Sequence, residues 1–336
     1  MKRKILYLGN KLAHKGYTPT SIDTLGPKLE SLNYELKYAS SEVSKTLRLF
    51  HMVLSIIKNR NWVDYVLIDT YSTQNFWYAW VSSIICRLFK LKYIPVLHGG
   101  NLPNRLKSNP KISKSIFSNS FINISPSLYL QVEFKKEGYP IIYIPNAIEI
   151  NKYTFKKRSK MRPKLLWVRS FAKLYNPLLA LQIVENLQST FPGIELCMVG
   201  PDKDGSLEHC KAYTKAHKLP VLFTGKLSKP EWIKLSEDYD IFINTTHFDN
   251  LPVSILEAMA LGLPVVSTNV GGIPYLITDK KNGILVEDND LEGFIHKIKI
   301  LISQYQYGIE ICENARFFSE SFSWEHVKNK WLKTLI

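Results

Sequence analysis

The sequence is poor in the features that would mark a membrane-spanning or disulfide-built protein. Its 336 residues contain no apolar run of about 18 residues, the length that predicts a transmembrane helix. No two cysteines are spaced as Cys-x-x-Cys, so neither a zinc site nor a disulfide framework is predicted. We expect ordinary core or surface thiols at all four cysteines, which are Cys86, Cys197, Cys210 and Cys312.

The first residues of the sequence do not predict a secretory signal. Residues 1–4 read Met-Lys-Arg-Lys, a charge pattern found at the start of signal peptides. However, the apolar segment that follows, Ile5–Leu8, is short and meets no small-residue cleavage site. We therefore expect Ile5–Leu8 to be the first β-strand of a cytoplasmic protein.

Acidic residues are scarce in the first half of the chain. Residues 1–150 carry 20 Lys and Arg against nine Asp and Glu, residues 151–336 carry 24 against 20, and the formal net charge is +15. A basic first half favours an acidic partner, which is nucleic acid, anionic lipid headgroups or a phosphorylated substrate. No aromatic-interleaved basic motif or nucleic-acid module is found, so nucleic acid is not expected.

Short apolar runs alternate with helical patterns along the whole chain. Such alternation predicts parallel sheets with helices on both faces. The runs are Ile5–Leu8, Tyr65–Ile68, Tyr93–Leu97, Phe121–Ile124, Ile141–Ile144, Leu165–Val168, Glu195–Val199, Val221–Phe223, Asp240–Asn244 and Pro264–Ser267. We thus expect an α/β protein with two Rossmann-like, doubly wound domains, residues 1–150 and 164–315, facing each other across a cleft. Residues 151–163, rich in basic residues, predict a linker.

Two segments of the first half combine apolar helical patterns with basic residues. Lys45–Lys58 has apolar residues at helical spacing, and Tyr78–Lys92 mixes aromatic, apolar and cationic residues in a similar way. Each is typical of a core-facing helix with solvated Lys and Arg tips. Each also fits a helix whose face rests on anionic lipid. Together with the basic first half, they favour peripheral contact with an anionic membrane.

The most informative stretch is Phe248–Pro274. A strand leads into a polar loop and then into a helix that we expect to begin around Ser254, since Ser254 and Glu257 have the spacing of a capping box. The loop would present backbone N–H groups and the positive helix end at the carboxyl edge of the sheet, which suits a diphosphate. The residues of this loop are Asn250, Leu251, Pro252, Val253 and Ser254. The glycine pair Gly271-Gly272 permits close backbone approach beside it.

Two further patterns in this stretch carry a family resemblance. Asp249 and Glu257 are separated by seven residues, and residues 257–266 read Glu-Ala-Met-Ala-Leu-Gly-Leu-Pro-Val-Val. The stretch resembles the retaining glycosyltransferases of family 4 (glycosyltransferases group 1), which have the GT-B fold. The resemblance implies that Glu257 accepts hydrogen bonds from the donor ribose, and that Asp249, where the family usually has Glu, contacts the transferred sugar. The other interpretation of Glu257 is a helix-capping role alone.

The same resemblance implies cations and glycine loops around a donor diphosphate. Arg169 follows the apolar run Leu165–Val168, where the family has an Arg that binds the diphosphate; an ordinary surface ion pair is the alternative. Leu174 or Tyr175 stands where the family has a Lys, and Lys173 is the candidate substitute. The remaining donor-side candidates follow other strands and are Gly200, Gly225, Lys226 and Leu227, the last three beside the base.

In the first half, His98 ends an apolar strand and is followed by Gly99 and Gly100. The resemblance implies that His98 faces the donor sugar and the acceptor, where a neutral His can orient a hydroxyl or stabilise developing charge. A purely structural His is the alternative. Gly16 resembles part of the family's flexible first loop near the acceptor. Residues 316–336 resemble the family's last helix, which crosses back onto the first domain.

The resemblance also implies retention of anomeric configuration with no cofactor and no essential metal. No acidic-x-acidic metal motif follows a strand. We expect a UDP- or GDP-sugar as co-substrate, and a lipid-linked or saccharide acceptor in cell-envelope polysaccharide or lipopolysaccharide assembly at the inner face of the cell membrane. Two alternatives stay open, a sugar epimerase or phosphorylase of the same fold and a non-catalytic protein that binds anionic polymers.

Overall fold

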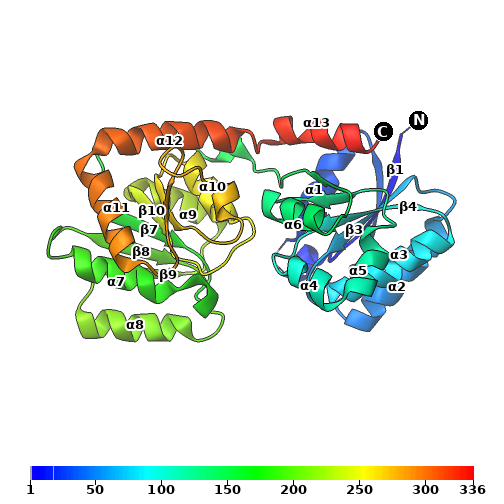
Figure 1. Ribbon diagram of the computed structural model, residues 1–336, viewed down its shortest axis with the longest axis horizontal. Helices are drawn as coiled ribbons and strands as arrows, with labels where there is room; N and C mark the ends of the chain where they lie inside the picture. The colour runs from blue at the N-terminus through cyan, green and yellow to red at the C-terminus, as the bar shows by residue number, and fades with distance from the viewer. Residues whose placement is uncertain (1, 18) are drawn as a thin grey trace. The chain divides into compact units, whose positions relative to one another are not determined.

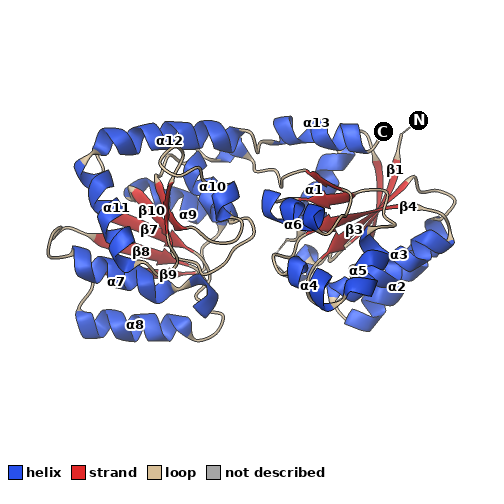
Figure 2. Ribbon diagram, viewed as in Figure 1, coloured by secondary structure: helices blue, strands red, loops and turns tan. Residues whose placement is uncertain are grey.

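The computed structural model describes residues 2–17 and 19–336, which divide into two compact units (Figure 1). Unit 1 consists of Met1–Asn146 with Val327–Ile336, and unit 2 of Ala147–His326. Each unit is built around a six-stranded sheet in which every registered strand pair is parallel (Figure 2). The predicted α/β class with two doubly wound units is confirmed.

Unit 1 has the strand order β2-β1-β3-β4-β5-β6. Its strands are β1 (Lys4–Leu8), β2 (Glu35–Ala39), β3 (Tyr65–Thr70), β4 (Lys92–Leu97), β5 (Asn123–Ser125) and β6 (Ile141–Tyr143). Its helices are α1 (Ser21–Glu30), α2 (Lys45–Asn59), α3 (Asn75–Leu88), α4 (Leu102–Ser108), α5 (Pro110–Phe117) and α6 (Leu128–Lys136). The second basic segment therefore differs from the prediction, because α3 ends at Leu88 and Lys92 already belongs to β4.

Unit 2 has the strand order β12-β11-β10-β7-β8-β9. Its strands are β7 (Lys164–Val168), β8 (Glu195–Val199), β9 (Val221–Gly225), β10 (Ile241–Asn244), β11 (Val265–Thr268) and β12 (Ile284–Val286). Its helices are α7 (Pro177–Leu187), α8 (Ser206–His217), α9 (Lys229–Leu235), α10 (Val253–Ala260), α11 (Leu291–Ser303) and α12 (Tyr305–Glu320). Successive residues of β7 pack into opposite cores: Leu165 and Trp167 into one, Leu166 into the other. Both faces of this sheet are thus buried, as parallel sheets require.

The tail is not a single helix over 316–336. Residues 316–320 end α12, the chain turns at Ser321–Ser323, and α13 (Trp324–Thr334) follows. The last residues pack in unit 1, where the Tyr65 hydroxyl donates to the carbonyl oxygen of Ile336 at 2.6 Å. No helix of the described chain has both the length and the apolar character needed to cross a bilayer.

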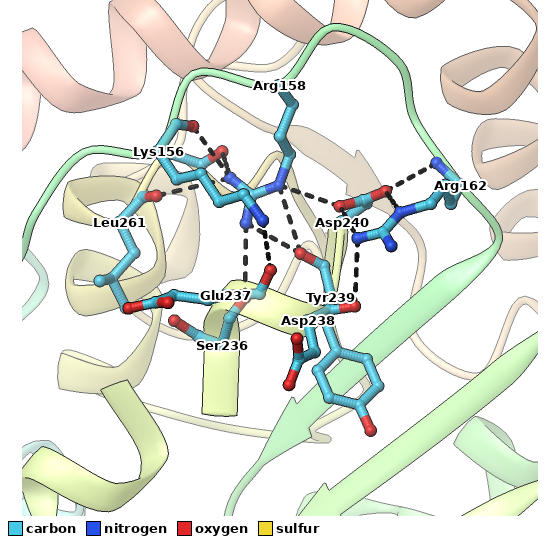
Figure 3. Close-up of polar contacts among 10 residues, drawn as sticks. Lys156, Arg158, Arg162, Ser236, Glu237, Asp238, Tyr239, Asp240 and Leu261 are labelled. Carbon is cyan, nitrogen blue, oxygen red and sulfur yellow. Dashed lines mark hydrogen bonds and ion pairs between the residues drawn. The ribbon is translucent and has the colours of Figure 1, made fainter. Parts of the chain in front are cut away.

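The basic stretch 151–163 belongs to unit 2 and is bonded to it (Figure 3). The Arg158 side chain is buried; its Nε lies 3.2 Å from Oδ1 of Asp240, and its Nη1 donates to the carbonyl of Gly262 at 2.6 Å. Arg162 Nε donates to Oδ2 of the same aspartate at 2.6 Å. Composition alone predicted a linker here; the structure shows a segment held to unit 2 by buried, paired charge.

Candidate functional site

The candidate site lies at the carboxyl edge of the unit 2 sheet. β7 is the first strand of this unit in sequence, and it lies between β8 and β10, so the strand order reverses between β7 and β10. Ligands of open parallel sheets bind beyond the strand ends at such a point. Arg169 directly follows β7, and Asp249 lies in the loop between β10 and α10. Two of the predicted residues therefore flank the switch point.

Arg169 and Asp249 form an ion pair, in which Nη2 of Arg169 contacts Oδ2 of Asp249. The guanidinium also lies 5.1 Å from the ring centre of Tyr175. Oδ1 of Asp249 accepts from the backbone N–H of Leu251 at 3.1 Å, so the carboxylate also shapes the loop. Nε of Arg169 is enclosed and has no hydrogen-bond partner among the described residues. The Arg169 side chain is thus held in position by Asp249, while its Nε–H has no acceptor within the described chain.

The start of α10 corrects the predicted capping box. The helix begins at Val253, its N-cap is Pro252, and no side chain caps it. Ser254 is therefore already inside the first turn, and its enclosed Oγ has no hydrogen-bond partner among the described residues. The N–H of Ile255 donates to the carbonyl of Pro252 at 3.0 Å, whereas those of Val253 and Ser254 have no acceptor among the described residues. Two amides at the positive end of α10 can therefore donate to an anion.

Glu257 is held by two residues that the sequence did not single out. Its buried Oε1 accepts from the Tyr153 hydroxyl at 2.7 Å and pairs with Nζ of Lys229, at the start of α9. Burial, followed by the charge of Glu257, raises the pKa of the Tyr153 hydroxyl, so Tyr153 remains a donor. The sequence position of Lys229 could have indicated a role in the site, because Lys229 follows the strand-end loop of Lys226 and Leu227. The sequence around Tyr153 contains no such indication.

Close backbone contacts fix the loop before α10. The N–H of Gly272 donates to the carbonyl of Asp249 at 2.7 Å. A Cβ added to Gly272 would lie 1.8 Å from the carbonyl oxygen of Asn250, so no side chain fits there. This is the close approach that the glycine pair predicted.

The other donor-side candidates occupy neighbouring strand ends. The N–H of Gly200, after β8, donates to the carbonyl of Gly225, at the end of β9, with a distance of 2.9 Å. Lys226 is exposed in the following loop and Leu227 is half-buried. Lys173 lies in a short 3-10 helix; its side chain is exposed, and its N–H donates to Oδ2 of Asp204 at 2.8 Å.

Four predicted residues belong to unit 1. Nε2 of His98 lies 2.8 Å from Oδ1 of Asp69, a buried carboxylate at the end of β3. Gly99 packs against Ser72, Gly100 lies in the turn before α4, and Gly16 ends the short 3-10 helix Ala13–Lys15 with a φ of +82°. Asp69 was missed, since it lies inside a strand with no motif around it.

The described part of the chain holds no group of three or more His, Cys, Asp or Glu side chains arranged to bind a metal. The positive charges at the unit 2 edge come instead from side chains, Arg169 and Lys229 among them, and from the start of α10. Such a set suits a diphosphate, whose oxygens accept hydrogen bonds from guanidinium, ammonium and amide groups.

Several known glycosyltransferases are similar to part of this sequence. In sequence, the chain is 29% identical over 156 residues to the sulfoquinovosyl transferase SQD2 of Arabidopsis thaliana, covering 45% of this chain and 29% of that protein. It is 26% identical over 178 residues to the UDP-Gal:alpha-D-GlcNAc-diphosphoundecaprenol alpha-1,3-galactosyltransferase of Escherichia coli, covering 47% of this chain and 44% of that protein. The matched region thus spans less than half the length of each relative.

The fold comparison covers the whole chain. The structure of Anabaena Alr3699/HepE in complex with UDP aligns with a TM-score of 0.74 and 17% identity, over 100% of this chain and 99% of that one. The fold is therefore GT-B. The family model for glycosyl transferases group 1 matches residues 149–317, the segment that carries Arg169, Asp249 and Glu257. This chain belongs to the glycosyl transferases group 1 family.

Proposed function

We propose that this chain transfers a sugar from a nucleotide-diphosphate donor to an acceptor hydroxyl, with retention of the anomeric configuration. The observation that supports this most directly is the edge of unit 2, where Arg169, the start of α10 and the buried Glu257 follow adjacent strands. We assign the diphosphate to the start of α10, facing Arg169. Glu257 then accepts hydrogen bonds from the ribose hydroxyls, which a carboxylate does well.

The proposed reaction needs charge stabilisation at the leaving group. The bond between the sugar C1 and the phosphate oxygen breaks, and a bond from C1 to the acceptor oxygen forms on the same face. The acceptor proton passes to the leaving phosphate. Preorganised cations and amides stabilise the charge that develops there. Arg169, Lys229 and the α10 amides supply this charge, which is why we propose no essential metal and no further cofactor.

For the acceptor, we propose a lipid-linked or saccharide substrate in cell-envelope polysaccharide or lipopolysaccharide assembly. The Escherichia coli relative carries a diphosphoundecaprenol-linked substrate in its name, which supports a lipid-linked acceptor. Residues 70–132 contain seven Lys and Arg and no Asp or Glu. On α2, Leu47 is 56% exposed and Phe50 61% exposed, and on α3 Leu88 is 70% exposed. Leu88 lies within this acid-free stretch, and α2 itself carries no Asp or Glu. These exposed apolar side chains beside basic residues support peripheral contact with an anionic membrane on the cytoplasmic side.

The nucleotide is tested by thermal unfolding of the whole chain with UDP, GDP and their common sugars. A ligand at 100 times its Kd stabilises the native state by about 2.7 kcal/mol, so the correct nucleotide raises Tm measurably. UDP is the first choice, because the Anabaena relative was crystallised with it. If no nucleotide or nucleotide sugar raises Tm, the donor assignment fails.

The reaction class is tested with the donor that binds. Transfer of labelled sugar to an added acceptor supports the proposal, whereas conversion of the donor with no acceptor supports an epimerase. Glu257→Ala should lower kcat/KM by about 100-fold or more, because charged hydrogen bonds are worth about 1.5–3 kcal/mol each. Glu208→Ala, an exposed glutamate on α8, is the matched control and should leave transfer unchanged.

A further inference from the structure

Asp69 and His98 meet at the carboxyl edge of the unit 1 sheet. β1 is the first strand of this unit and lies between β2 and β3, so the strand order reverses between β1 and β3. Asp69 lies near the end of β3, and His98 follows β4, the neighbouring strand. This edge is therefore the unit 1 counterpart of the ligand-binding edge of unit 2.

The Asp69 carboxylate is buried and hydrogen-bonded to other residues of unit 1. Its side chain is 1% exposed, and Oδ1 receives both the Tyr7 hydroxyl at 3.0 Å and Nε2 of His98 at 2.8 Å. Oδ2 is enclosed and has no partner among the described residues; a Cβ added to Gly9 would lie 2.5 Å from it. Burial, then the charge of Asp69, raises the pKa of Tyr7, so the Tyr7 hydroxyl donates. Asp69 is thus too enclosed to meet a substrate itself.

The imidazole of His98 is restrained on three sides. Its backbone N–H donates to the carbonyl of Thr70 at 2.8 Å, and the ring of Tyr71 lies 5.1 Å from its own ring, centre to centre. Nε2 is hydrogen-bonded to Oδ1 of Asp69. Nδ1 has no hydrogen-bond partner among the described residues, yet it is not one of the enclosed polar atoms, and 8% of the side chain is exposed. Nδ1 is therefore the ring nitrogen that a bound molecule can reach.

We propose that Asp69 is a positioning residue that fixes the tautomer of His98, with the proton on Nε2 and the lone pair on the reachable Nδ1. A carboxylate only accepts hydrogen bonds, so the ring nitrogen that faces it must carry a proton. With this tautomer, the neutral form of His98 accepts a hydrogen bond at Nδ1 and cannot donate one there. The partner it selects is a hydroxyl that donates, and this last step rests on the proposed sugar transfer.

The proton is located by NMR of the whole chain labelled with ¹⁵N-histidine, because the protonated and unprotonated ring nitrogens differ widely in chemical shift. The His98 signals are those lost in His98→Gln. We expect Nε2 to be protonated in the wild type, and Asp69→Ala to give a mixture of tautomers. A proton on Nδ1 in the wild type, or an Asp69→Ala spectrum identical to it, overturns the proposal.

Asp69→Asn covers the case in which Asp69→Ala does not fold. It keeps an oxygen that accepts from Nε2 but removes the charge, so the Nε2–H signal should remain and move upfield; an unmoved signal contradicts the proposal. In sugar transfer, Asp69→Ala should lower kcat/KM by about 100-fold through misplacement of His98. Asp64→Asn, at the opposite end of β3, is the control that should leave transfer unchanged.

The NMR measurement tests the tautomer of His98, and the kinetic measurement tests sugar transfer and the positioning role of Asp69. If the wild type is inactive but Nε2 is protonated, the proposed sugar transfer is contradicted and the tautomer assignment is supported. An active Asp69→Ala variant with normal kcat/KM would overturn the positioning role, whatever the donor.

Discussion

The hydroxyl of Tyr153 donates to Oε1 of Glu257 at 2.7 Å, and both side chains are buried in unit 2. Tyr153 comes from the stretch 151–163, which composition alone predicts to be a linker. The carbonyl of Tyr153 is held in turn by Nη1 of Arg316, on α12, at 2.7 Å. The carboxylate assigned to the donor ribose is therefore oriented by residues far from it in sequence.

Removing that hydroxyl should weaken donor binding without removing the carboxylate. Tyr153→Phe leaves Glu257 paired only with the half-exposed Lys229, and loss of a buried hydrogen bond to a charged group costs about 1–3 kcal/mol. We expect a lower free energy of unfolding and a higher KM for the donor. Urea denaturation and donor titration measure the two effects. Tyr305→Phe, at an exposed position, should change neither.

Gly272→Ala should distort the loop before α10. The new Cβ would overlap the carbonyl of Asn250, and the backbone must move to relieve the overlap, at a cost of about 1–3 kcal/mol. The loop that carries Asp249 and the α10 amides moves with it, so the nucleotide should no longer raise Tm. Gly193→Ala is the matched control, because a Cβ there meets no atom within 4 Å. A normal nucleotide response in Gly272→Ala would contradict the assigned loop geometry.

Arg158 should be essential to the stability of unit 2. Arg158→Met leaves Asp240 paired with Arg162, but it removes the donor from two buried carbonyls, those of Gly262 and Tyr239. Each buried acceptor left without its donor costs about 1–3 kcal/mol, so we expect a loss of about 2–6 kcal/mol. Lys157→Met removes the neighbouring cation, whose side chain is 77% exposed, and should change the free energy of unfolding by less than about 1 kcal/mol. Chemical denaturation of both variants measures the difference.

Low pH should weaken the ion pairs that Asp240 forms with Arg158 and Arg162. Burial acts to raise the pKa of Asp240, but hydrogen bonds and charge from Arg162 and Arg158 outweigh it and hold the pKa below its usual value. A carboxyl with a lowered folded pKa contributes stability above its unfolded pKa of about 3.9 and loses it as pH falls through the folded value. The free energy of unfolding should therefore fall on acidification below about pH 4, and less steeply in Asp240→Asn.

Vesicle binding should depend on the exposed face of α2. Phe50→Glu puts a negative charge among apolar and basic residues, so binding to anionic vesicles should fall by about 30-fold, since loss of an inserted side chain and charge repulsion each cost about 1 kcal/mol. Phe317→Glu, at an 80% exposed site of unit 2, should bind as the wild type does. Sedimentation with anionic and uncharged vesicles is the measurement. Equal binding of wild type and Phe50→Glu would exclude α2 from the contact.

The sequence predicted the two parallel sheets because buried parallel strands are continuous apolar runs, as in Leu165–Val168. It missed β2, where the residues before the buried Ala39 are alternately exposed and half-buried at a sheet edge, and it missed the short edge strand β12. Asp249 and Glu257 stood out through their motif. Lys229 and Asp69 did not, because their roles arise from contacts across the fold. The basic composition around Arg158 predicted a linker, whereas Arg158 itself is buried and paired with Asp240.

Arg316, on α12, contacts both the segment of Tyr153 and the end of α10. Its Nη1 bonds the carbonyl of Tyr153 and that of Ala260, the last residue of α10, each at 2.7 Å. One guanidinium thus ties together the end of the helix whose start is assigned to phosphate and the residue that orients Glu257. The family match ends at residue 317, directly after it. A substitution at Arg316 should therefore disturb both contacts at once, even though α12 carries none of the residues assigned to the donor.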